Sequence, residues 1–378
     1  MKKIFYPILG VGLAFCLQKN TLAADWTYDV GGQAYSLYGY ADLDKNDVLA
    51  KSENHFENIG FLNASVTYSF NDDYSISWFL DVMGATDKEI QNFNNGSWGK
   101  QISADLNTPF GTLSVGEIWN AAYNLSVSAP QVGPLYLNNS EIVDFISNPN
   151  WFRRNKKYTS FKTLNSTDIN TDGTALKAAY YTPEFYNTVL GFSYTPDTQN
   201  RRGLVNNQAK YARDDAYNFG LAQNFDIGAF NIQSSLGYGI FHKNDKEFSA
   251  GINLSYGNWD LGGAFRKTYV EGSDFAITSN FVSDKIPALF DNYREGKAWN
   301  VGIGYKFGPL KTSLGYFEAQ ADNTSNQDEI VLWSNDFQVN KYLNLYASAA
   351  HINFKGDSNL AEDNRKGYAF VAGVGFQF

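Results

Sequence analysis

The last twelve residues decide the fold: Gly367-Tyr368-Ala369-Phe370-Val371-Ala372-Gly373-Val374-Gly375-Phe376-Gln377-Phe378. The even-numbered positions are all apolar or aromatic, and the odd-numbered positions are small or polar, apart from Val371. Successive side chains of a β-strand point to opposite faces of the sheet. The segment is therefore predicted to be a strand with one face suited to lipid and the other suited to water or to close packing.

The same alternation runs upstream to Trp26, which predicts an all-β chain. Most of the segments are long enough to cross a bilayer as tilted strands, which takes about nine to eleven residues. No break in composition suggests a second domain. The sixteen predicted strands are 26–43, 58–70, 73–85, 99–108, 111–120, 174–183, 187–196, 214–225, 229–242, 247–257, 259–270, 296–307, 309–321, 327–339, 341–354 and 367–378.

The connections alternate between tight turns and longer loops. Gly257-Asn258 and Gly308-Pro309 have the residues of tight turns, whereas 271–295 and 121–173 are long and polar. Tight turns on one side, long loops on the other, an even strand count and both chain ends on the turn side are typical of an outer-membrane β-barrel. The sequence therefore predicts a transmembrane antiparallel barrel of about sixteen strands.

The composition agrees with strands that cross a membrane. The chain has 29 Phe, 25 Tyr and 8 Trp, yet no uninterrupted apolar stretch long enough for a spanning helix. A soluble sandwich or propeller would also alternate. Several tryptophans, including Trp26, Trp259 and Trp299, lie in or at the edges of predicted strands, as in the aromatic girdles of a barrel.

The N-terminal segment is predicted to be a targeting signal. Lys2 and Lys3 precede the apolar stretch 4–17, and Thr21-Leu22-Ala23-Ala24 offers small residues for cleavage. This pattern predicts a signal peptide over 1–23 and a barrel domain over 24–378. The only cysteine, Cys16, falls within the signal, so the remainder has no disulfide or thiolate metal site. The net charge of −9 argues against a nucleic-acid partner.

Three features resemble the Gram-negative general porins. They are Tyr38-Gly39-Tyr40-Ala41-Asp42 in the first strand, a longest loop (121–173) after the fifth strand, and the alternation that ends in Phe378. The resemblance implies a homotrimer in the outer membrane, with the long third loop folded into the lumen. It also implies a passive pore for ions and small hydrophilic solutes, without cofactor or enzymatic activity.

Loop 121–173 is the candidate for the pore constriction, because it alone is long enough to narrow the lumen. Residues 135–145 are expected to form a short helical turn, with Glu141 and Asp144 on one face. By resemblance these two carboxylates form the acidic side of the constriction. The alternative is that both are ordinary solvated side chains.

The other candidate constriction and lumen residues come from parity and position. Lys177 and Arg266 face the lumen by strand parity, whereas Glu117 faces it only if a bulge intervenes. Arg153 and Arg154 begin a basic run that either reaches the neck, binds lipopolysaccharide phosphates or lies solvated at the rim.

Two positions depart from the porin pattern. Tyr40 and Gly116-Glu117 stand where the family often has basic lumen residues. The positive side of the constriction is therefore weakened. Strand parity also places Asp81, Asp105, Asp336 and Lys306 on the inner face, and the overall balance of inward charge predicts a weak cation preference.

One segment resembles half of a calcium loop. Asp168, Asn170 and Asp172 alternate ahead of Gly173, but position twelve of the pattern is Ala179 in place of Glu. The alternatives are a weak extracellular calcium site and an ordinary Asx turn.

Three further hypotheses stay open. A substrate-specific channel would use aromatic steps, for which Tyr40, Phe79, Tyr181 and Phe317 are candidates. An adhesin or receptor barrel would use its long loops as a binding surface. An outer-membrane hydrolase would need a nucleophile beside one of His55, His242 and His351, and none of these lies in a nucleophile motif.

Overall fold

The computed structural model describes most of the chain. Residues 1–24, which include the predicted signal peptide, lie outside the described part. Side chains of residues 54, 55, 84, 85, 99, 100 and 151–161 are also not described. The described residues are 25–43, 54–85, 99–135, 137, 151–154, 157–161, 163–164, 166–198, 215–241, 245–269, 295–322, 324–356 and 364–378.

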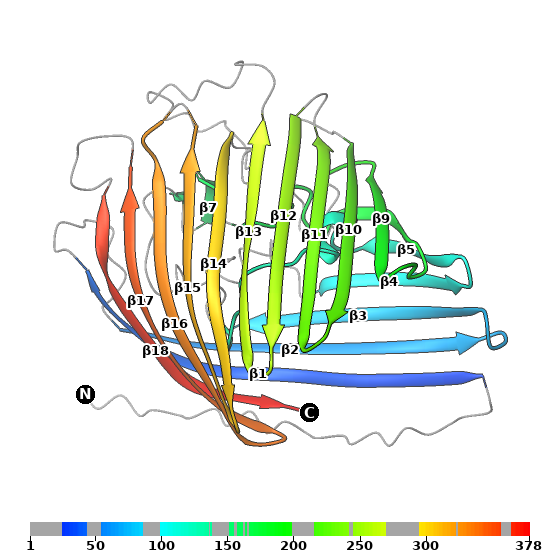
Figure 1. Ribbon diagram of the computed structural model, residues 1–378, viewed down its shortest axis with the longest axis horizontal. Coiled ribbons are helices and arrows are strands. Elements are labelled where there is room, and N and C mark those ends of the chain that lie inside the picture. The colour runs from blue at the N-terminus through cyan, green and yellow to red at the C-terminus, as the bar shows by residue number, and fades with distance from the viewer. Residues whose placement is uncertain are drawn as a thin grey trace.

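Sixteen strands form one closed antiparallel barrel, which confirms the predicted fold class (Figure 1). Each strand pairs with its neighbours in sequence, apart from the jump from β5 to β8 and the closure of β1 on β18. The strands are β1 (Trp26–Leu43), β2 (Asn54–Ser69), β3 (Ser75–Ala85), β4 (Gly99–Thr108), β5 (Gly111–Glu117), β8 (Leu176–Tyr181), β9 (Thr188–Thr195), β10 (Ala216–Ile227), β11 (Phe230–Phe241), β12 (Asp245–Tyr256), β13 (Trp259–Tyr269), β14 (Gly296–Phe307), β15 (Leu310–Ala321), β16 (Gln327–Asn340), β17 (Leu343–Lys355) and β18 (Arg365–Gln377).

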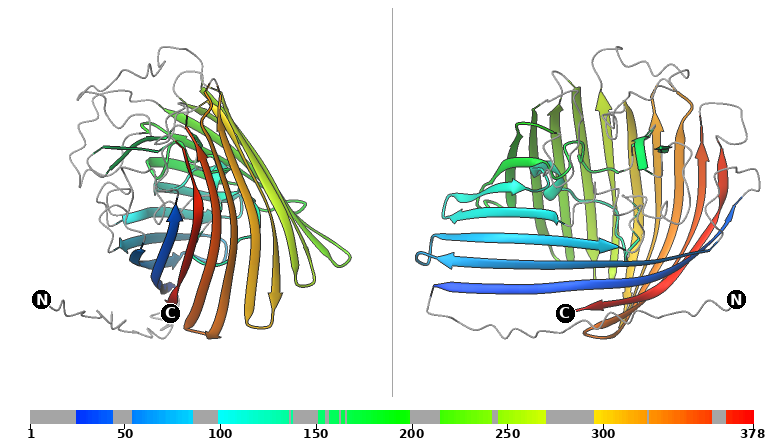
Figure 2. Two further views of the ribbon diagram at one scale, coloured as in Figure 1. Left: turned by 90° about the vertical axis from the view of Figure 1, so that its left-hand side faces the viewer. Right: turned by 180° about the vertical axis from the view of Figure 1, so that it is seen from behind.

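The strands are tilted, so β1–β4 on one wall cross β10–β14 on the other steeply (Figure 2). The first and last strands close the barrel in continuous register from Gln33 opposite Gln377 to Leu43 opposite Gly367. The C-terminal residue takes part, because Phe378 and Gly32 exchange backbone hydrogen bonds of 3.1 and 3.2 Å. Residues Trp26–Gly32 of β1 extend further toward the turn side, where they pair with β2.

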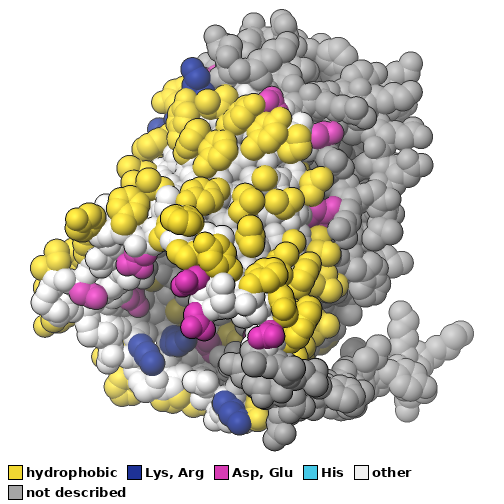
Figure 3. Space-filling view, turned by 90° about the vertical axis from the view of Figure 1, so that its right-hand side faces the viewer, with side chains coloured by type: hydrophobic (Ala, Val, Ile, Leu, Met, Phe, Trp, Pro, Cys, Tyr) yellow, Lys and Arg dark blue, Asp and Glu magenta, His cyan; other side chains and the backbone are white. Residues whose placement is uncertain are grey.

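Strand parity separates an apolar outer face from a polar inner face, as predicted. Leu261, Leu314 and Trp333 stand about half exposed on the outside. Figure 3 shows hydrophobic side chains over much of one side of the barrel and charged side chains around a hollow. An outer surface of this kind is suited to lipid. Among the described residues, no helix is long and apolar enough to cross a membrane.

The long loop has regular structure of its own. It contains the short helix α2 (Ala121–Asn124) and a hairpin of β6 (Trp151–Arg154) and β7 (Lys157–Phe161). The strand predicted over 111–120 ends earlier, at Glu117, because Asn120 caps α2: its Oδ1 accepts a hydrogen bond from the Tyr123 N–H at 2.8 Å. The helical turn expected within 135–145 falls largely outside the described residues.

Candidate functional site

The first part of the long loop enters the barrel and follows its inner wall. Helix α2 packs against β8–β11, and the Ala121 N–H donates to Ser193 Oγ at 3.0 Å. Further along, the Val127 N–H donates to Ser235 Oγ at 2.8 Å and the Ala129 N–H donates to Asn300 Oδ1 at 3.2 Å. The loop therefore lies in the lumen, as the porin resemblance implied.

Small residues on the wall allow this close approach. A Cβ added at Gly251 would lie 1.7 Å from the Val127 carbonyl oxygen, and one at Gly220 would lie 2.6 Å from the Ala121 carbonyl oxygen. Any side chain at these two positions would displace the loop backbone, since real contacts of carbon with oxygen are much longer. The loop backbone therefore packs directly against the glycine-rich inner face of the wall.

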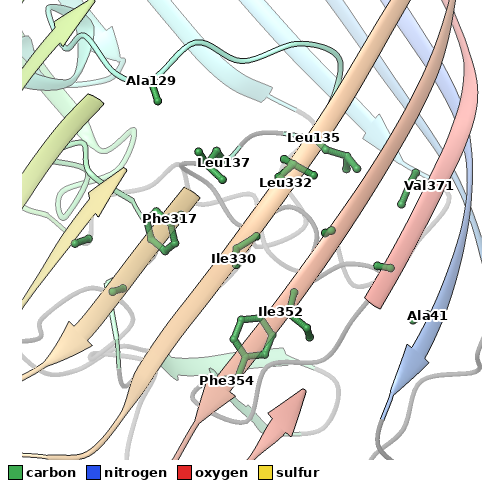
Figure 4. Close-up of a cluster of buried hydrophobic side chains, with 14 of the residues drawn as sticks. Ala41, Ala129, Leu135, Leu137, Phe317, Ile330, Leu332, Ile352, Phe354 and Val371 are labelled. Atoms are coloured by element: carbon green, nitrogen blue, oxygen red, sulfur yellow. The ribbon is translucent and has the colours of Figure 1, made fainter. Parts of the chain in front are cut away.

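An apolar cluster holds the far end of this stretch. Leu135 and Leu137 of the loop are buried against inward-facing residues of β15–β18, among them Phe317, Leu332 and Ile352 (Figure 4). Burial of side chains of this size contributes roughly 1.5–3 kcal/mol each. The wall of β15–β18 at this height is thus covered by the loop and does not line water.

The returning part of the loop is fixed by polar contacts. Thr163 Oγ1 donates to Asp328 on β16 at 2.5 Å, and Asn300 on β14 donates to Thr167 Oγ1 at 3.1 Å. Ile169 is fully buried beside Ala122. The outgoing and returning stretches therefore lie against the same wall.

Lys177 forms the first of two buried charged centres. Its Nζ donates to the carbonyl oxygens of Ile118 and Gly173 at 2.6 and 2.7 Å and lies 3.3 Å from Asp172 Oδ2. The same Asp172 carboxylate accepts from Asn120 at 2.6 Å and from Thr195 at 2.7 Å. A buried pair satisfied by this many hydrogen bonds is stable as a unit and costly to break.

Arg266 forms the second centre. Its Nε and Nη2 donate to Glu247 Oε2 at 3.0 and 2.7 Å. Its Nη1 donates to Asn170 Oδ1 at 2.9 Å and its Nη2 to Thr171 Oγ1 at 2.9 Å, while Thr171 in turn hydrogen-bonds Glu247. The guanidinium thus ties the returning loop to β12 and β13.

Asn120 links the two ends of the loop. Its side-chain nitrogen donates to Asp172 and to the Ile169 carbonyl oxygen, at 2.6 and 2.9 Å, while its oxygen caps α2. One fully buried amide therefore fastens the start of the loop to its end.

These contacts define the positions of two predicted constriction residues. Lys177 and Arg266 face inward, as parity indicated, but each is only 1% exposed beneath the loop. They are placed to hold the loop in position, and water does not reach them. Sequence reasoning missed this because most of their partners come from the loop, which no strand pattern locates.

Two other predicted lumen residues face outward. Tyr40 pairs in register with Phe370, and both are exposed on the outer face. It lies outside because Leu37 and Ala41, at odd positions of β1, are the inward residues. Glu117 keeps the outward parity of Leu113 and Val115, since β5 pairs with β4 and β8 without a bulge.

The remaining constriction candidates lie where side chains are not described. Glu141 and Asp144 are outside the described residues. Arg153 and Arg154 belong to β6, which places their backbone in the loop hairpin. Their assignment to the constriction stays a prediction.

The calcium hypothesis gains no support from the local geometry. Residues 170–173 form a turn, with the Gly173 N–H donating to the Asn170 carbonyl oxygen at 2.9 Å. The side-chain oxygens of Asn170 and Asp172 are directed to Arg266 and Lys177, whereas Asp168 accepts from Ser166 at 3.0 Å. The described residues contain no group of three His, Cys, Asp or Glu side chains suited to a metal. Calcium binding stays an untested prediction.

The open part of the lumen carries mostly acidic side chains, and most of them lie toward the turn side. Among the described residues that are not buried, strand register places six carboxylates and two lysines on the inner face. Glu57, Asp245, Asp328 and Arg365 also face inward but are buried. Strand parity placed Asp81, Asp105, Asp336 and Lys306 on the inner face from the sequence alone. The same alternation, applied to the other strands, also identifies the remaining four. The charged inward residues that are not buried are Asp29, Asp81, Asp105, Asp226, Asp260, Asp336, Lys306 and Lys311.

A closed barrel with an apolar exterior, a charged interior and an inward-folded loop defines a transmembrane channel protein. A family model described as "Gram-negative porin" matches residues 20–357. The chain belongs to this family and is a multi-pass β-barrel of the outer membrane. A search of curated protein sequences found no match.

Solved structures share the fold at low sequence identity. The anion-selective porin from Comamonas acidovorans is 14% identical, with a TM-score of 0.60 over 94% of this chain and all of that one. The Salmonella typhi OmpF complex with daunomycin is 13% identical, with a TM-score of 0.62 over 93% and 98%. OmpT of Vibrio cholerae, described as in-vitro folded and in trimer form, is 13% identical, with a TM-score of 0.58 over 94% and 100%.

The buried centre at Arg266 yields a test of how the loop is held. Arg266→Met leaves Glu247 and its loop partners without their cation, and we expect a loss of about 3–5 kcal/mol in the free energy of unfolding. Urea titration of the refolded protein measures this loss. The double variant Arg266→Met/Glu247→Gln should recover much of the stability, and Lys306→Met in the open lumen should change little. Equal stability of Arg266→Met and wild type would contradict the tethering role.

Proposed function

We propose that this porin is a passive diffusion pore that favours cations over anions. The observation that supports the preference is the acidic excess of the open lumen: six carboxylates against two lysines among the described inward residues that are not buried, a net charge of 2 − 6 = −4. Lys177 and Arg266 do not offset it, because each is paired with a carboxylate under the loop. Charges that line a narrow aqueous path set ion preference.

The proposal includes the absence of catalysis. The one histidine whose side chain is described, His351, lies on the outer face, its ring 5.0 Å from that of Tyr368. A channel needs only the geometry and field of its lumen, and both are supplied by the loop and the inward carboxylates. An adhesin or hydrolase gains no specific support from the described residues.

A homotrimer is proposed from the family and from the outer surface of β1 and its neighbours. The related structure of Vibrio cholerae OmpT is described as a trimer form. On this chain, Ala34 and Ser36 of β1 face outward. Ala34 is opposite Gly60 of β2, and Ser36 is diagonal to Ala372 of β18. Such short side chains allow another subunit to approach closely. Gly32 also faces outward, but the Phe378 ring covers it.

Phosphorylated lipid, such as lipopolysaccharide, is proposed as a partner of the outer rim. Lys246, Lys267 and Lys297 face outward at the loop-side ends of β12–β14, directly above apolar outer-face residues. Lys267 and Lys297 are opposite one another across β13 and β14, and Lys267 pairs with Asp322. Like charges placed opposite are unfavourable. Asp322 compensates Lys267, and a lipid phosphate is proposed to compensate Lys246 and Lys297.

Conductance tests the pore and its preference. Single channels in a planar bilayer under a potassium chloride gradient should show steady current steps. The zero-current potential should have the sign produced when potassium passes more readily than chloride. Asp29→Asn/Asp105→Asn/Asp226→Asn reduces the net negative charge of the open lumen from −4 to −1 and should move that potential toward zero. Glu117→Gln, on the outer face, is the matched control and should leave it unchanged. A zero-current potential of the opposite sign in the wild type would show that chloride passes more readily, and would overturn the proposed cation preference.

Light scattering tests the trimer. The purified protein in detergent, corrected for bound detergent, should have three times the mass of one chain. A stable monomer would refute the homotrimer.

Lipid retention tests the rim lysines. Lys246→Ser/Lys267→Ser/Lys297→Ser should lower the lipopolysaccharide phosphorus that copurifies with the protein several-fold, because three phosphate ligands are lost. Lys306→Ser/Lys311→Ser, inside the lumen, is the control. Retention equal in both variants and wild type would show that the rim lysines do not bind it.

A further inference from the structure

Three aromatic residues form a half-buried patch on the inner wall, here called the aromatic shelf: Tyr35 on β1, Phe61 on β2 and Tyr346 on β17. Strand register places all three on the inner face. Tyr346 is opposite Gly373, which is opposite inward Leu37, and Tyr35 and Phe61 keep the inward parity of Leu37 and Glu57. Aromatic side chains that face a water-filled lumen call for an explanation, since burial elsewhere would be more favourable.

The rings contact one another and lie against the wall. The centroid of the Tyr35 ring is 6.2 Å from that of Phe61 and 5.6 Å from that of Tyr346. A Cβ at Gly375 would lie 2.5 Å from the Tyr346 ring and 3.0 Å from the Tyr35 ring, so both rings cover this glycine. The shelf is therefore a continuous aromatic surface across β17, β18, β1 and β2.

Amide side chains border the shelf. The Tyr35 hydroxyl donates to Gln33 Oε1 at 2.5 Å, and Gln33 is opposite Phe61. Asn63 follows two residues later on the same inward face, and both amides are exposed. Aromatic faces beside amide groups combine an apolar contact with hydrogen bonding at its edge.

The loop and the shelf lie next to one another. Gly133 of the loop, with a φ of +78°, approaches Tyr346 so closely that a Cβ there would lie 3.1 Å from the ring. Tyr35 also packs against the apolar cluster that holds Leu135 and Leu137. A solute that passes the loop therefore meets the shelf.

We propose that the aromatic shelf is a weak binding site for solutes with a flat apolar face and hydroxyl groups at its edge, of which a pyranose sugar is the simplest kind. The ring face of the sugar lies on Phe61, Tyr35 or Tyr346, and its hydroxyls bond Gln33 and Asn63. This inference rests on the proposed pore function, because the shelf is reached only through an open lumen.

Of the four aromatic steps expected from the sequence, Phe79 on β3 and Tyr181 on β8 face inward and are half-buried, as the shelf residues are. Tyr40 faces outward, Phe317 is buried in the apolar cluster, and Tyr181 accepts a hydrogen bond from Asn124 at 2.7 Å beside α2. The shelf lies on other residues than those the sequence suggested.

The experiment is block of single-channel current by maltose, with sorbitol at equal osmolality as the open-chain reference. In the wild type, maltose should reduce the current in a saturable way, whereas sorbitol should lower it only in proportion to its concentration. Phe61→Ser and Tyr346→Ser should each raise the half-blocking maltose concentration about tenfold, because one stacking face is lost. Tyr346→Phe, which keeps the ring, should retain the block.

The matched control is Phe79→Ser. Like Phe61→Ser, it replaces an inward phenylalanine by serine and widens the lumen, but it lies outside the shelf. It should conduct more current and leave the half-blocking concentration unchanged. Maltose block that does not saturate, or that Phe61→Ser and Tyr346→Ser leave unaltered, would overturn the shelf while the ion current still supports the pore. Loss of ion current in the wild type would instead remove the pore proposal itself.

Discussion

Backbone hydrogen bonding around the whole circumference is the constraint on which the rest of the structure depends. A spanning strand in lipid has no water for its N–H and C=O groups, so each of the sixteen strands must have a partner on both sides. Closure of β1 on β18 meets this condition, with the C-terminal residue bonded to Gly32. Only within a closed wall can alternate residues face lipid and lumen, and the chemistry of the lumen follows from that separation.

Inside the wall, buried charge and open charge have different roles. The centres at Lys177 and Arg266 pair every cation with a carboxylate and join β8, β12 and β13 to one loop. Within each centre the opposite charges cancel at short range. The two centres therefore influence the width of the path more than its preference for cations or anions. The carboxylates of the open lumen, nearer the turns, act on a passing ion through water, where their influence reaches about 8–10 Å at physiological salt. In the proposed pore, sieving and ion preference therefore come from different parts of the lumen.

The sequence was sufficient for the wall and insufficient for what lies inside it. Period-two alternation located all sixteen strands, because each strand must match a lipid face and a lumen face. Parity also oriented Lys177 and Arg266 correctly, but could not show their burial, since Asp172, Asn170 and Thr171 reach them from a loop without a repeating pattern. Tyr40 was assigned to the lumen because porins often have a basic lumen residue at the corresponding position. The alternation around buried Leu37 instead places Tyr40 on the outer face. The shelf escaped notice because its three rings lie far apart in sequence and meet only when the barrel closes.

The seam between β1 and β18 has a consequence for the order of events during assembly. The two strands that complete the circle are the first and the last of the described chain to be synthesised, so the most distant pairing in sequence is also the one that removes the final free edges. Until the last strand arrives, both edges present unpaired backbone that would join any available strand. The edges of a partly formed sheet must therefore be shielded in lipid until β18 has paired with β1.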